Sequence, residues 1–381
     1  MTNSNFSAFR ITRSALALVL ALSTLSSAAS LDSLQKAFVS MKYGMFVHFN
    51  MGTYTMSDLS LPGLNPDQFN PDSLDCGKWA DAAAAAGMKY MVLTVKHHDG
   101  FCLWNSAFTK YGVASSKWRG GKGDVVREFV DSCRSRGLAV GLYFSIWDRD
   151  HAKDADTTFI KNQITELLTN YGPIALLWFD GWGWQIPYTA VPWETVRMAI
   201  KAVQPNCLAI NNSQEHNLSR TEVVEWEKGG HAGTSISDTN SLPSEMCETV
   251  ISSGKWFYPG PALVNNLYSA AVLTSLLQAC NSRNANLLLD VSPDQNGVIP
   301  ASQVARIREL GMTPTTIRPY LFVKRDQSFD RSVGARISIW GSSSVSPSLD
   351  FSSRSFDLRG REFGQALQKA ARLSANGSGI R

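Results

Sequence analysis

The sequence predicts an α/β fold, a (β/α)8-like (TIM) barrel followed by a short, β-rich C-terminal appendage. From Met41 onward, short apolar runs rich in β-forming residues alternate with longer stretches of helical periodicity. Strands that alternate with helices pair in parallel through right-handed crossovers, and about seven or eight such units fit within roughly 270 residues. No Gly-x-Gly-x-x-Gly motif follows the first apolar run, as it would in a dinucleotide-binding sheet. A closed barrel therefore fits this alternation better than an open sheet.

Each element is assigned from its local pattern. The apolar runs predicted to be strands are, in chain order, Tyr43–Phe49, Tyr90–Val95, Ala139–Ser145, Ile174–Phe179, Cys207–Ile210, Val223–Trp226 and Asn286–Val291. The stretches predicted to be helices are Gly77–Ala86 with its alanine run, Val125–Arg136, Thr158–Asn170, Trp193–Val203 and Val264–Ala279. Beyond Pro300 the pattern changes, with strands expected at Tyr320–Val323 and Ala335–Trp340 and a helical period over Gly360–Leu373.

The first 29 residues have the order of a secretory signal peptide. Arg10 and Arg13 precede an apolar run over residues 15–22, and small residues follow through Ala29. This run is too short to span a bilayer, and no later segment is long and apolar enough to do so. We therefore expect a secreted (extracellular) protein, with residues 1–29 as the signal peptide, 30–312 as the barrel and 313–381 as the appendage.

The composition excludes some classes of partner. Lys and Arg number 36 against 32 Asp and Glu, a net charge of +4, and they are scattered along the chain, so we expect no nucleic-acid partner. Eleven Trp and ten Tyr supply broad amphipathic rings of the kind that stack on sugars. The six cysteines are far apart with no Cys-x-x-Cys spacing, which indicates neither a zinc site nor a dense disulfide scaffold. Asn211, Asn217 and Asn376 begin N-glycosylation acceptor sequences.

Polar residues close four consecutive apolar runs. They occur in Val47-His48-Phe49, Lys96-His97-His98-Asp99, Tyr143-Phe144-Ser145 and Trp178-Phe179-Asp180-Gly181. In a barrel enzyme the chemistry takes place at the carboxyl ends of the strands. A single His or Asp at a strand end more often satisfies a loop or caps a helix, but four such ends in a row favour a chemical site.

These residues suit three kinds of chemistry to different degrees. His48, His97, His98 and Asp180 resemble a set of metal ligands, but neighbouring strand residues point to opposite faces, so His97 and His98 should not share one ion. No Gly-x-Ser-x-Gly elbow is present, and no cysteine closes a strand beside a His. A carboxylate nucleophile remains, and Asp180 is placed to act as one if a second carboxyl group serves as acid/base.

Several blocks of sequence resemble the α-L-fucosidases of glycoside hydrolase family 29. They fall in the family's order between about Lys42 and Pro300, and the Lys96–Trp104 block is the most specific. The blocks are Lys42–Phe49, Phe69-Asn70-Pro71, Trp79-Ala80, Gly87–Thr94, Lys96–Trp104, Trp178–Gly181, Pro243-Ser244-Glu245, Gly254–Tyr258 and Asn281–Val291.

This resemblance implies an exo-acting, retaining glycosidase that removes terminal α-L-fucose from a fucosylated oligosaccharide or glycoconjugate. It implies that Asp180 is the nucleophile and that no metal or cofactor is needed. It also implies that His48, His97, His98 and Tyr143 bind the fucose hydroxyls and that Trp104 and Trp178 form part of the sugar pocket.

Two glutamates are candidates for the acid/base. Glu227, in Glu225-Trp226-Glu227-Lys228-Gly229, lies at a strand end and aligns with the acid/base of one branch of the family. Glu245 aligns with the glutamate used by another branch. We place Glu227 first, because the sequence that follows is closer to the first branch. The alternatives are that Glu227 pairs with Lys228 or His231 and that Glu245 orients a loop.

Two departures from the family pattern bear on these expectations. Family members carry a full β-sandwich after the barrel, whereas the short appendage here would be a truncated one. The region 211–241, where the acid/base often lies, matches only loosely.

A non-catalytic carbohydrate-binding protein on a degenerate glycosidase barrel is the alternative function, but it predicts loss of the nucleophile, and Asp180 is present. The loops after Asn50, Trp104 and Asp148 are expected to form the side of the site that holds the leaving group.

Overall fold

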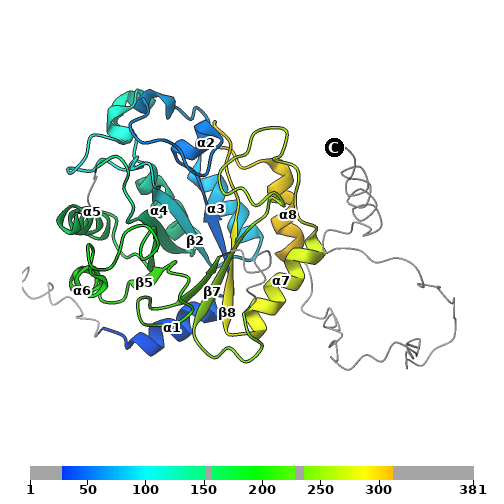
Figure 1. Cartoon of the computed structure of the whole chain (residues 1–381). Helices are drawn as coiled ribbons and strands as arrows, with labels where there is room; N and C mark the ends of the chain where they lie inside the picture. The colour runs from blue at the N-terminus through cyan, green and yellow to red at the C-terminus, as the bar shows by residue number, and fades with distance from the viewer. Residues whose placement is uncertain (1–27, 152–155, 228–235, 312–381) are drawn as a thin grey trace, which may run out of the picture. The chain divides into compact units, whose positions relative to one another are not determined.

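The computed structural model describes residues 28–151, 156–227 and 236–311. Eight parallel strands form a closed barrel in the order β1 to β8, as the sequence predicts (Figure 1). The strands are β1 (Tyr43–Val47), β2 (Tyr90–Lys96), β3 (Ala139–Ser145), β4 (Leu176–Asp180), β5 (Leu208–Asn211), β6 (Val224–Glu227), β7 (Ser244–Thr249) and β8 (Ala285–Asp290). The expected signal peptide, apart from its last two residues, and the expected strands and helix of the appendage lie outside the described residues.

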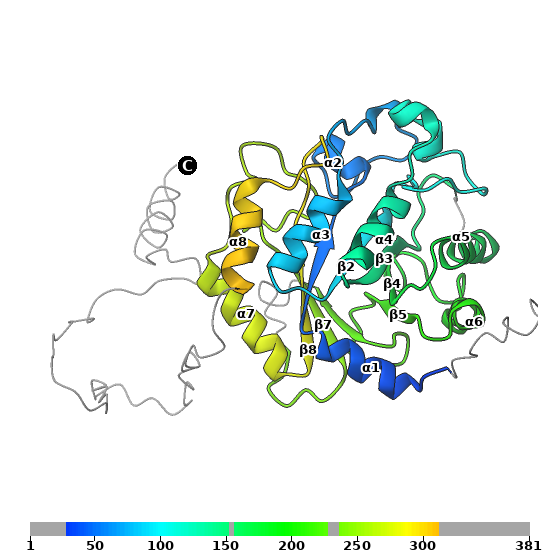
Figure 2. The same ribbon diagram turned by 180° about the vertical axis from the view of Figure 1, so that it is seen from behind.

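Helices surround the barrel (Figures 1 and 2). They are α1 (Leu31–Ser40), α2 (Met51–Thr55), α3 (Cys76–Ala85), α4 (Val125–Ser135), α5 (Thr157–Asn170), α6 (Trp193–Val203), α7 (Ala270–Ser282) and α8 (Ala301–Gly311), with short 3₁₀ turns at Pro66–Gln68, Val113–Ser115 and Trp118–Gly121. Asp75, Asp124 and Asp156 cap the N-termini of α3, α4 and α5, where their carboxylates accept backbone N–H groups that have no partner within the helix. The link from β5 to β6, residues 212–223, contains no helix.

Alternation along each strand separates two hydrophobic cores. One fills the barrel and includes Phe46, Tyr143 and Trp178, and Phe38 of α1 joins it. The other lies between the strands and the outer helices. Because α1 leads into the start of β1, its apolar residues close the amino-terminal end of the barrel and leave the carboxyl end for the site. Gly44 faces inward where no side chain fits, since a Cβ there would lie 2.3 Å from the Tyr90 ring.

The structure differs from the sequence prediction in one strand and in several helices. Strand β7 was missed because its residues, Ser244-Glu245-Met246-Cys247-Glu248-Thr249, are largely polar, yet all six are buried. The helix expected from Val264 begins six residues later, where the side chain of Ser269 caps α7. Helices α1, α2 and α8 were not predicted, although the sequence carries a local signal for two of them, since the side chain of Ser30 caps α1 and that of Asn50 caps α2.

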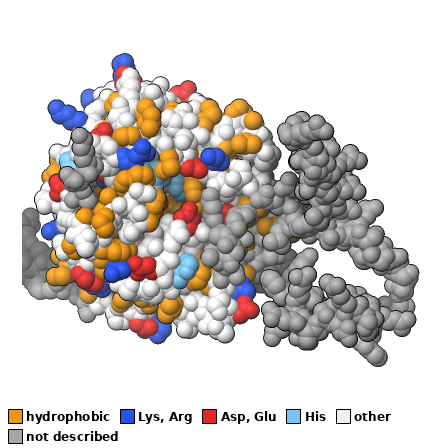
Figure 3. Space-filling model, in the orientation of Figure 1, with side chains coloured by type: hydrophobic (Ala, Val, Ile, Leu, Met, Phe, Trp, Pro, Cys, Tyr) orange, Lys and Arg blue, Asp and Glu red, His pale blue; other side chains and the backbone are white. Residues whose placement is uncertain are grey.

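The surface charges, the cysteines and the glycosylation acceptors can be located in the structure. On the face shown in Figure 3, Lys and Arg side chains are scattered among acidic and hydrophobic ones. All six cysteines are buried and unpaired. Of the glycosylation acceptors, Asn217 is exposed, whereas Asn211 is buried in β5 and its amide donates to Tyr188 and Arg220, so Asn211 is not accessible to a glycosyltransferase. Asn376 lies outside the described residues. No helix in residues 28–151, 156–227 or 236–311 is long and apolar enough to cross a membrane.

Candidate active site

A cavity of about 290 Å³ lies at the carboxyl ends of the strands. Residues that end or follow β1, β2, β4, β5 and β6 line it, as expected for a barrel enzyme. Seven of the nine site residues predicted from the sequence are on its wall: His48, His97, His98, Tyr143, Trp178, Asp180 and Glu227. Trp104 and Glu245 are not. The other lining residues are Phe46, Asp58, Leu59, Trp184, Asn212, Gln214, Cys247 and Trp256.

Asp180 is the last residue of β4, and its carboxylate receives three hydrogen bonds. The Gly181 N–H donates to Oδ1 at 2.7 Å, the Tyr143 hydroxyl to Oδ2 at 2.9 Å and the Trp184 indole N–H to Oδ1 at 3.3 Å. Burial raises the pKa of Asp180, and these three donors act to lower it. Gly181 has φ of +72°, and a Cβ there would lie 2.5 Å from the Trp147 Cβ, so glycine is needed directly after the carboxylate.

Two of the three histidines, His48 and His98, are fixed by hydrogen-bond partners behind the cavity wall. His48 Nδ1 lies 2.7 Å from Oδ1 of Asp290, and His98 Nδ1 lies 2.7 Å from the Ser145 hydroxyl. Burial lowers the pKa of His98 to about 3 and that of His97 well below its usual value, so both rings are neutral near pH 7. His98 Nε2 is 3.6 Å from Asp180 Oδ2, too far for a hydrogen bond.

The expectation that His97 and His98 point to opposite faces is wrong. Strand β2 ends at Lys96, after a register shift between Thr94 and Lys96 in its pairing with β3. Both histidines therefore follow the strand, where alternation no longer applies, and both line the cavity with ring centroids 4.2 Å apart. Within the part of the chain that the structure describes, no group of three or more His, Cys, Asp or Glu side chains is placed to hold a metal ion.

Aromatic rings form one wall of the cavity. The Tyr143 ring stacks on two others. Its centroid lies 5.4 Å from that of His97, with an interplanar angle of 13°, and 5.4 Å from that of Trp178, with an interplanar angle of 19°. Phe46 meets Trp178 edge-on at 5.2 Å. Trp256 lies 5.1 Å from the His48 ring and is held from behind, since Asp58 accepts its backbone N–H at 3.1 Å. The wall offers apolar ring faces bordered by imidazole and hydroxyl groups, which suits a sugar ring.

The two candidate acid/base residues lie at different depths. Glu227 ends β6, is half-buried on the cavity wall and accepts the Asn212 amide at 2.8 Å. Glu245 lies inside the barrel with no exposed surface. It accepts the Tyr90 hydroxyl, and the Trp178 indole N–H donates to it at 3.1 Å. The structure thus separates the two residues that the sequence left as rivals.

Trp104 lies away from the cavity. Its ring is buried in the core outside the barrel, and its N–H donates to Glu166 at 3.1 Å. Glu166 also accepts the Ser106 hydroxyl at 2.8 Å and the Ala107 N–H at 2.7 Å. The contacts of Trp104 therefore anchor the loop after β2 to α5.

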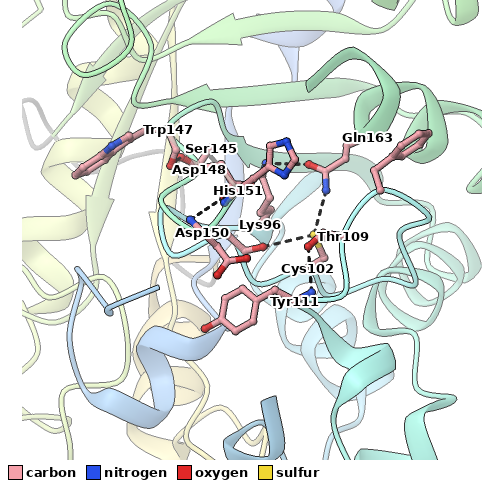
Figure 4. Close-up of polar contacts among 12 residues, drawn as sticks. Lys96, Cys102, Thr109, Tyr111, Ser145, Trp147, Asp148, Asp150, His151 and Gln163 are labelled. Carbon is pink, nitrogen blue, oxygen red and sulfur yellow. Dashed lines mark hydrogen bonds and ion pairs between the residues drawn. The ribbon is translucent and has the colours of Figure 1, made fainter. Parts of the chain in front are cut away.

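Lys96, the residue directly before His97, forms a buried ion pair with Asp148 (Figure 4). Lys96 has no exposed surface, and its ammonium donates to Asp148 at 2.8 Å and to Gln163 of α5 at 2.9 Å. The other oxygen of Asp148 accepts the N–H groups of Asp150 and His151. The pair therefore joins the end of β2 to the loop that follows β3.

Several lining residues were missed by the sequence reasoning. Asn212 directly follows β5, so the strand-end rule could have found it. Trp184 and Trp256 come from loops whose course the sequence does not fix, although Trp256 lies within a block that resembles the family. Of the loops expected on the leaving-group side, the one after Asn50 contributes Asp58 and Leu59 to the wall, and the described residues of the loops after Trp104 and Asp148 contribute none.

Comparison with known proteins agrees with this geometry. A sequence model of the α-L-fucosidase family matches residues 52–313. A putative α-L-fucosidase 1 of Oryza sativa is 33% identical over 308 residues, 73% of this chain and 56% of the relative, and α-L-fucosidase 1 of Arabidopsis thaliana is 31% identical over 72% and 58%. The chain thus spans little more than half the length of these curated relatives.

Solved structures show the same fold. A glycoside hydrolase family 29 member from an unknown rumen bacterium superposes with a TM-score of 0.66 at 32% identity, over 73% of this chain and 56% of the other. α-L-Fucosidase isoenzyme 1 from Paenibacillus thiaminolyticus superposes with a TM-score of 0.63 at 29% identity, over 74% and 75%.

Proposed function

The chain belongs to the α-L-fucosidase family, glycoside hydrolase family 29, and we propose that it hydrolyses terminal α-L-fucose from fucosylated glycans with retention of configuration. The observation that carries the proposal is that Asp180 and Glu227, two carboxyl groups from different strands, line one cavity with an aromatic wall. Such a pair is what a retaining glycosidase uses as nucleophile and acid/base.

In the first step, a carboxylate oxygen of Asp180 attacks the anomeric carbon of fucose. The bond from that carbon to the leaving oxygen breaks, and Glu227 gives its proton to this oxygen. The product is a fucosyl ester of Asp180. In the second step Glu227 takes a proton from water, the water oxygen attacks the same carbon, and the ester bond breaks to return Asp180.

The surrounding donors suit this chemistry. The N–H and O–H groups that donate to Asp180 lower its pKa, whereas its burial raises it. These donors therefore favour the ionised form of Asp180 that attacks. Neutral His97 and His98 can exchange hydrogen bonds with sugar hydroxyls without placing positive charge beside an electron-poor transition state. The Asn212 amide donates to Oε2 of Glu227 at 2.8 Å and orients this carboxyl group at the cavity wall.

Replacement of the nucleophile tests the proposal. Asp180→Gly should abolish turnover of an aryl α-L-fucoside, because it removes the oxygen that attacks the anomeric carbon, and external azide should restore part of the rate with a fucosyl azide of inverted configuration. Asp72→Gly, at an exposed loop position away from the cavity, is the control and should behave as the parent. Parent-like activity in Asp180→Gly would overturn the assignment.

A chain that binds fucose but hydrolyses no fucoside would favour the carbohydrate-binding alternative. Release of fucose from a panel of linked oligosaccharides would identify the linkage that the enzyme accepts. The signal-like order of residues 1–29 supports the further proposal that the protein is exported, which N-terminal sequencing of protein recovered from the medium would test.

A further inference from the structure

Two glutamates lie side by side inside the barrel, away from the cavity lining. Glu225 of β6 and Glu245 of β7 are partners in the register of the two strands, and they are 2% and 0% exposed. The residues two positions further along, Glu227 and Cys247, are also register partners, and both line the cavity. The Glu225–Glu245 pair therefore lies one layer below the cavity.

Both oxygens of Glu245 receive hydrogen bonds from barrel residues. Oε2 accepts the Tyr90 hydroxyl from β2, and Oε1 accepts the Trp178 indole N–H from β4 at 3.1 Å. Neither oxygen of Glu225 has a hydrogen-bond partner of normal geometry within the described residues. Burial raises the pKa of Glu225 well above its usual value, and of the neighbouring charged groups Glu245 raises this pKa the most. Burial raises the pKa of Glu245 to about 7, against the lowering effect of the Tyr90, Glu225 and Trp178 hydrogen bonds, so of the two residues Glu225 holds its proton more firmly.

The contacts of Glu245 lead to the nucleophile. Trp178, which it fixes, forms part of the cavity wall and stacks on Tyr143 at 5.4 Å. The Tyr143 hydroxyl donates to Asp180 at 2.9 Å. A tilt of the Trp178 ring would therefore move the wall against which a sugar packs and the donor on which Asp180 depends.

We propose that Glu245, paired with protonated Glu225, is a positioning residue that holds Trp178 as part of the cavity wall, and that it does not protonate the leaving group. This inference rests on the proposed function and deepens it. Glu245 does not line the cavity, and its two oxygens already accept the Tyr90 and Trp178 donors, so it has no access to the leaving oxygen.

The test compares Glu245→Ala, Glu245→Gln and Glu227→Ala on two fucosides, one with an acidic and one with a poor leaving group. A positioning role predicts that Glu245→Ala loses about 10- to 100-fold in kcat/KM on both substrates alike, with no rescue by azide. Glu245→Gln keeps an acceptor for Trp178 and should recover to within about tenfold of the parent. Glu227→Ala should instead spare the substrate with the acidic leaving group in the first step and be rescued by azide. Glu248→Gln, on the same strand but the opposite face, is the matched control.

A second variant separates positioning from general loss of stability. Trp178→Phe keeps a ring but removes the N–H that Glu245 accepts, so its effect and that of Glu245→Ala should not add in the double variant. Near-UV circular dichroism of the free protein should differ between Glu245→Ala and parent, and this difference should largely vanish in the Trp178→Phe background. That measurement needs no substrate.

The outcomes distinguish the two proposals. Azide rescue of Glu245→Ala, or a loss confined to the poor leaving group, would overturn the positioning role while Asp180→Gly still supported the fucosidase assignment. Additive effects of Glu245→Ala and Trp178→Phe would also overturn it. Full activity in Asp180→Gly would instead overturn the proposed function. The near-UV circular dichroism difference between Glu245→Ala and the parent would still report whether Glu245 fixes Trp178.

Discussion

The hydrogen bond from Tyr143 to Asp180 offers a test in which one atom is removed from the site. Tyr143→Phe deletes the hydroxyl that donates to Asp180 Oδ2 at 2.9 Å. The phenyl ring that remains can keep the stacking of Tyr143 on His97 and Trp178, where the interplanar angles are 13° and 19°. The substitution therefore changes the hydrogen bonding of the carboxylate and leaves the wall of the cavity in place.

The size of the effect follows from the charge of the acceptor. A hydrogen bond to an ionised group contributes about 1.5–3 kcal/mol, which corresponds to roughly 10- to 150-fold in kcat/KM if it is retained in the transition state. The Tyr143 hydroxyl also acts to lower the pKa of Asp180, whose burial raises it. Its removal therefore raises this pKa further. Because the nucleophile must be ionised, the acidic limb of the pH profile should move to higher pH.

The assay is kcat/KM for an activated aryl fucoside, measured across the acidic limb for the parent and the variant. Tyr43→Phe is the control, because the Tyr43 hydroxyl is buried on β1 without a hydrogen-bond partner within the described residues and does not line the cavity. Its kinetics should match those of the parent. Parent-like kcat/KM together with an unmoved acidic limb in Tyr143→Phe would refute the role given to this hydrogen bond.

Two further predictions concern stability. Lys96→Met leaves buried Asp148 without its ion-pair partner and should lower the free energy of unfolding in urea by about 3–5 kcal/mol; a loss below about 1 kcal/mol would contradict the pairing. Burial raises the pKa of Asp99 to about 7, so this group stabilises the fold fully below its unfolded pKa, and that contribution is lost as the pH rises through about 7. Asp99→Asn keeps an acceptor for the Phe101 N–H and cannot ionise, so the decline in unfolding free energy between pH 4.5 and 8 should shrink by about 3 kcal/mol; identical declines in both proteins would refute this.

The barrel could be predicted from the sequence because its alternation of strands and helices is a local property. Seven strands have apolar runs that mark them without knowledge of their neighbours. Strand β7 does not, because Ser244, Glu245 and Thr249 are polar yet buried, and their burial depends on partners in β2, β4 and β8 that only the closed barrel brings together. A polar strand of this kind has no signal in a window of its own residues.

The position of Asp180 was predictable for a similar reason, since the residue that ends an apolar strand lies at the carboxyl end of the barrel whatever the other strands do. The position of Trp104 in the core outside the barrel could not be predicted, because this residue follows a loop rather than a strand. That His97 and His98 both line the cavity could not be predicted either. It depends on where β2 stops, and the register shift after Thr94 places that end one residue before the pair.

The choice between Glu227 and Glu245 depends on height inside the barrel, which alternation cannot give. Period two places Glu225, Glu227, Glu245 and Cys247 all on the inward face, and so makes each glutamate of this set equally eligible for the site. Height comes from the stagger between neighbouring strands, which closure of the barrel imposes. Here the register pairs Glu225 with Glu245 and Glu227 with Cys247. Had β7 been shifted by two residues toward the carboxyl end, Glu245 would lie opposite Glu227 at the cavity, and the same sequence pattern would have described a different site.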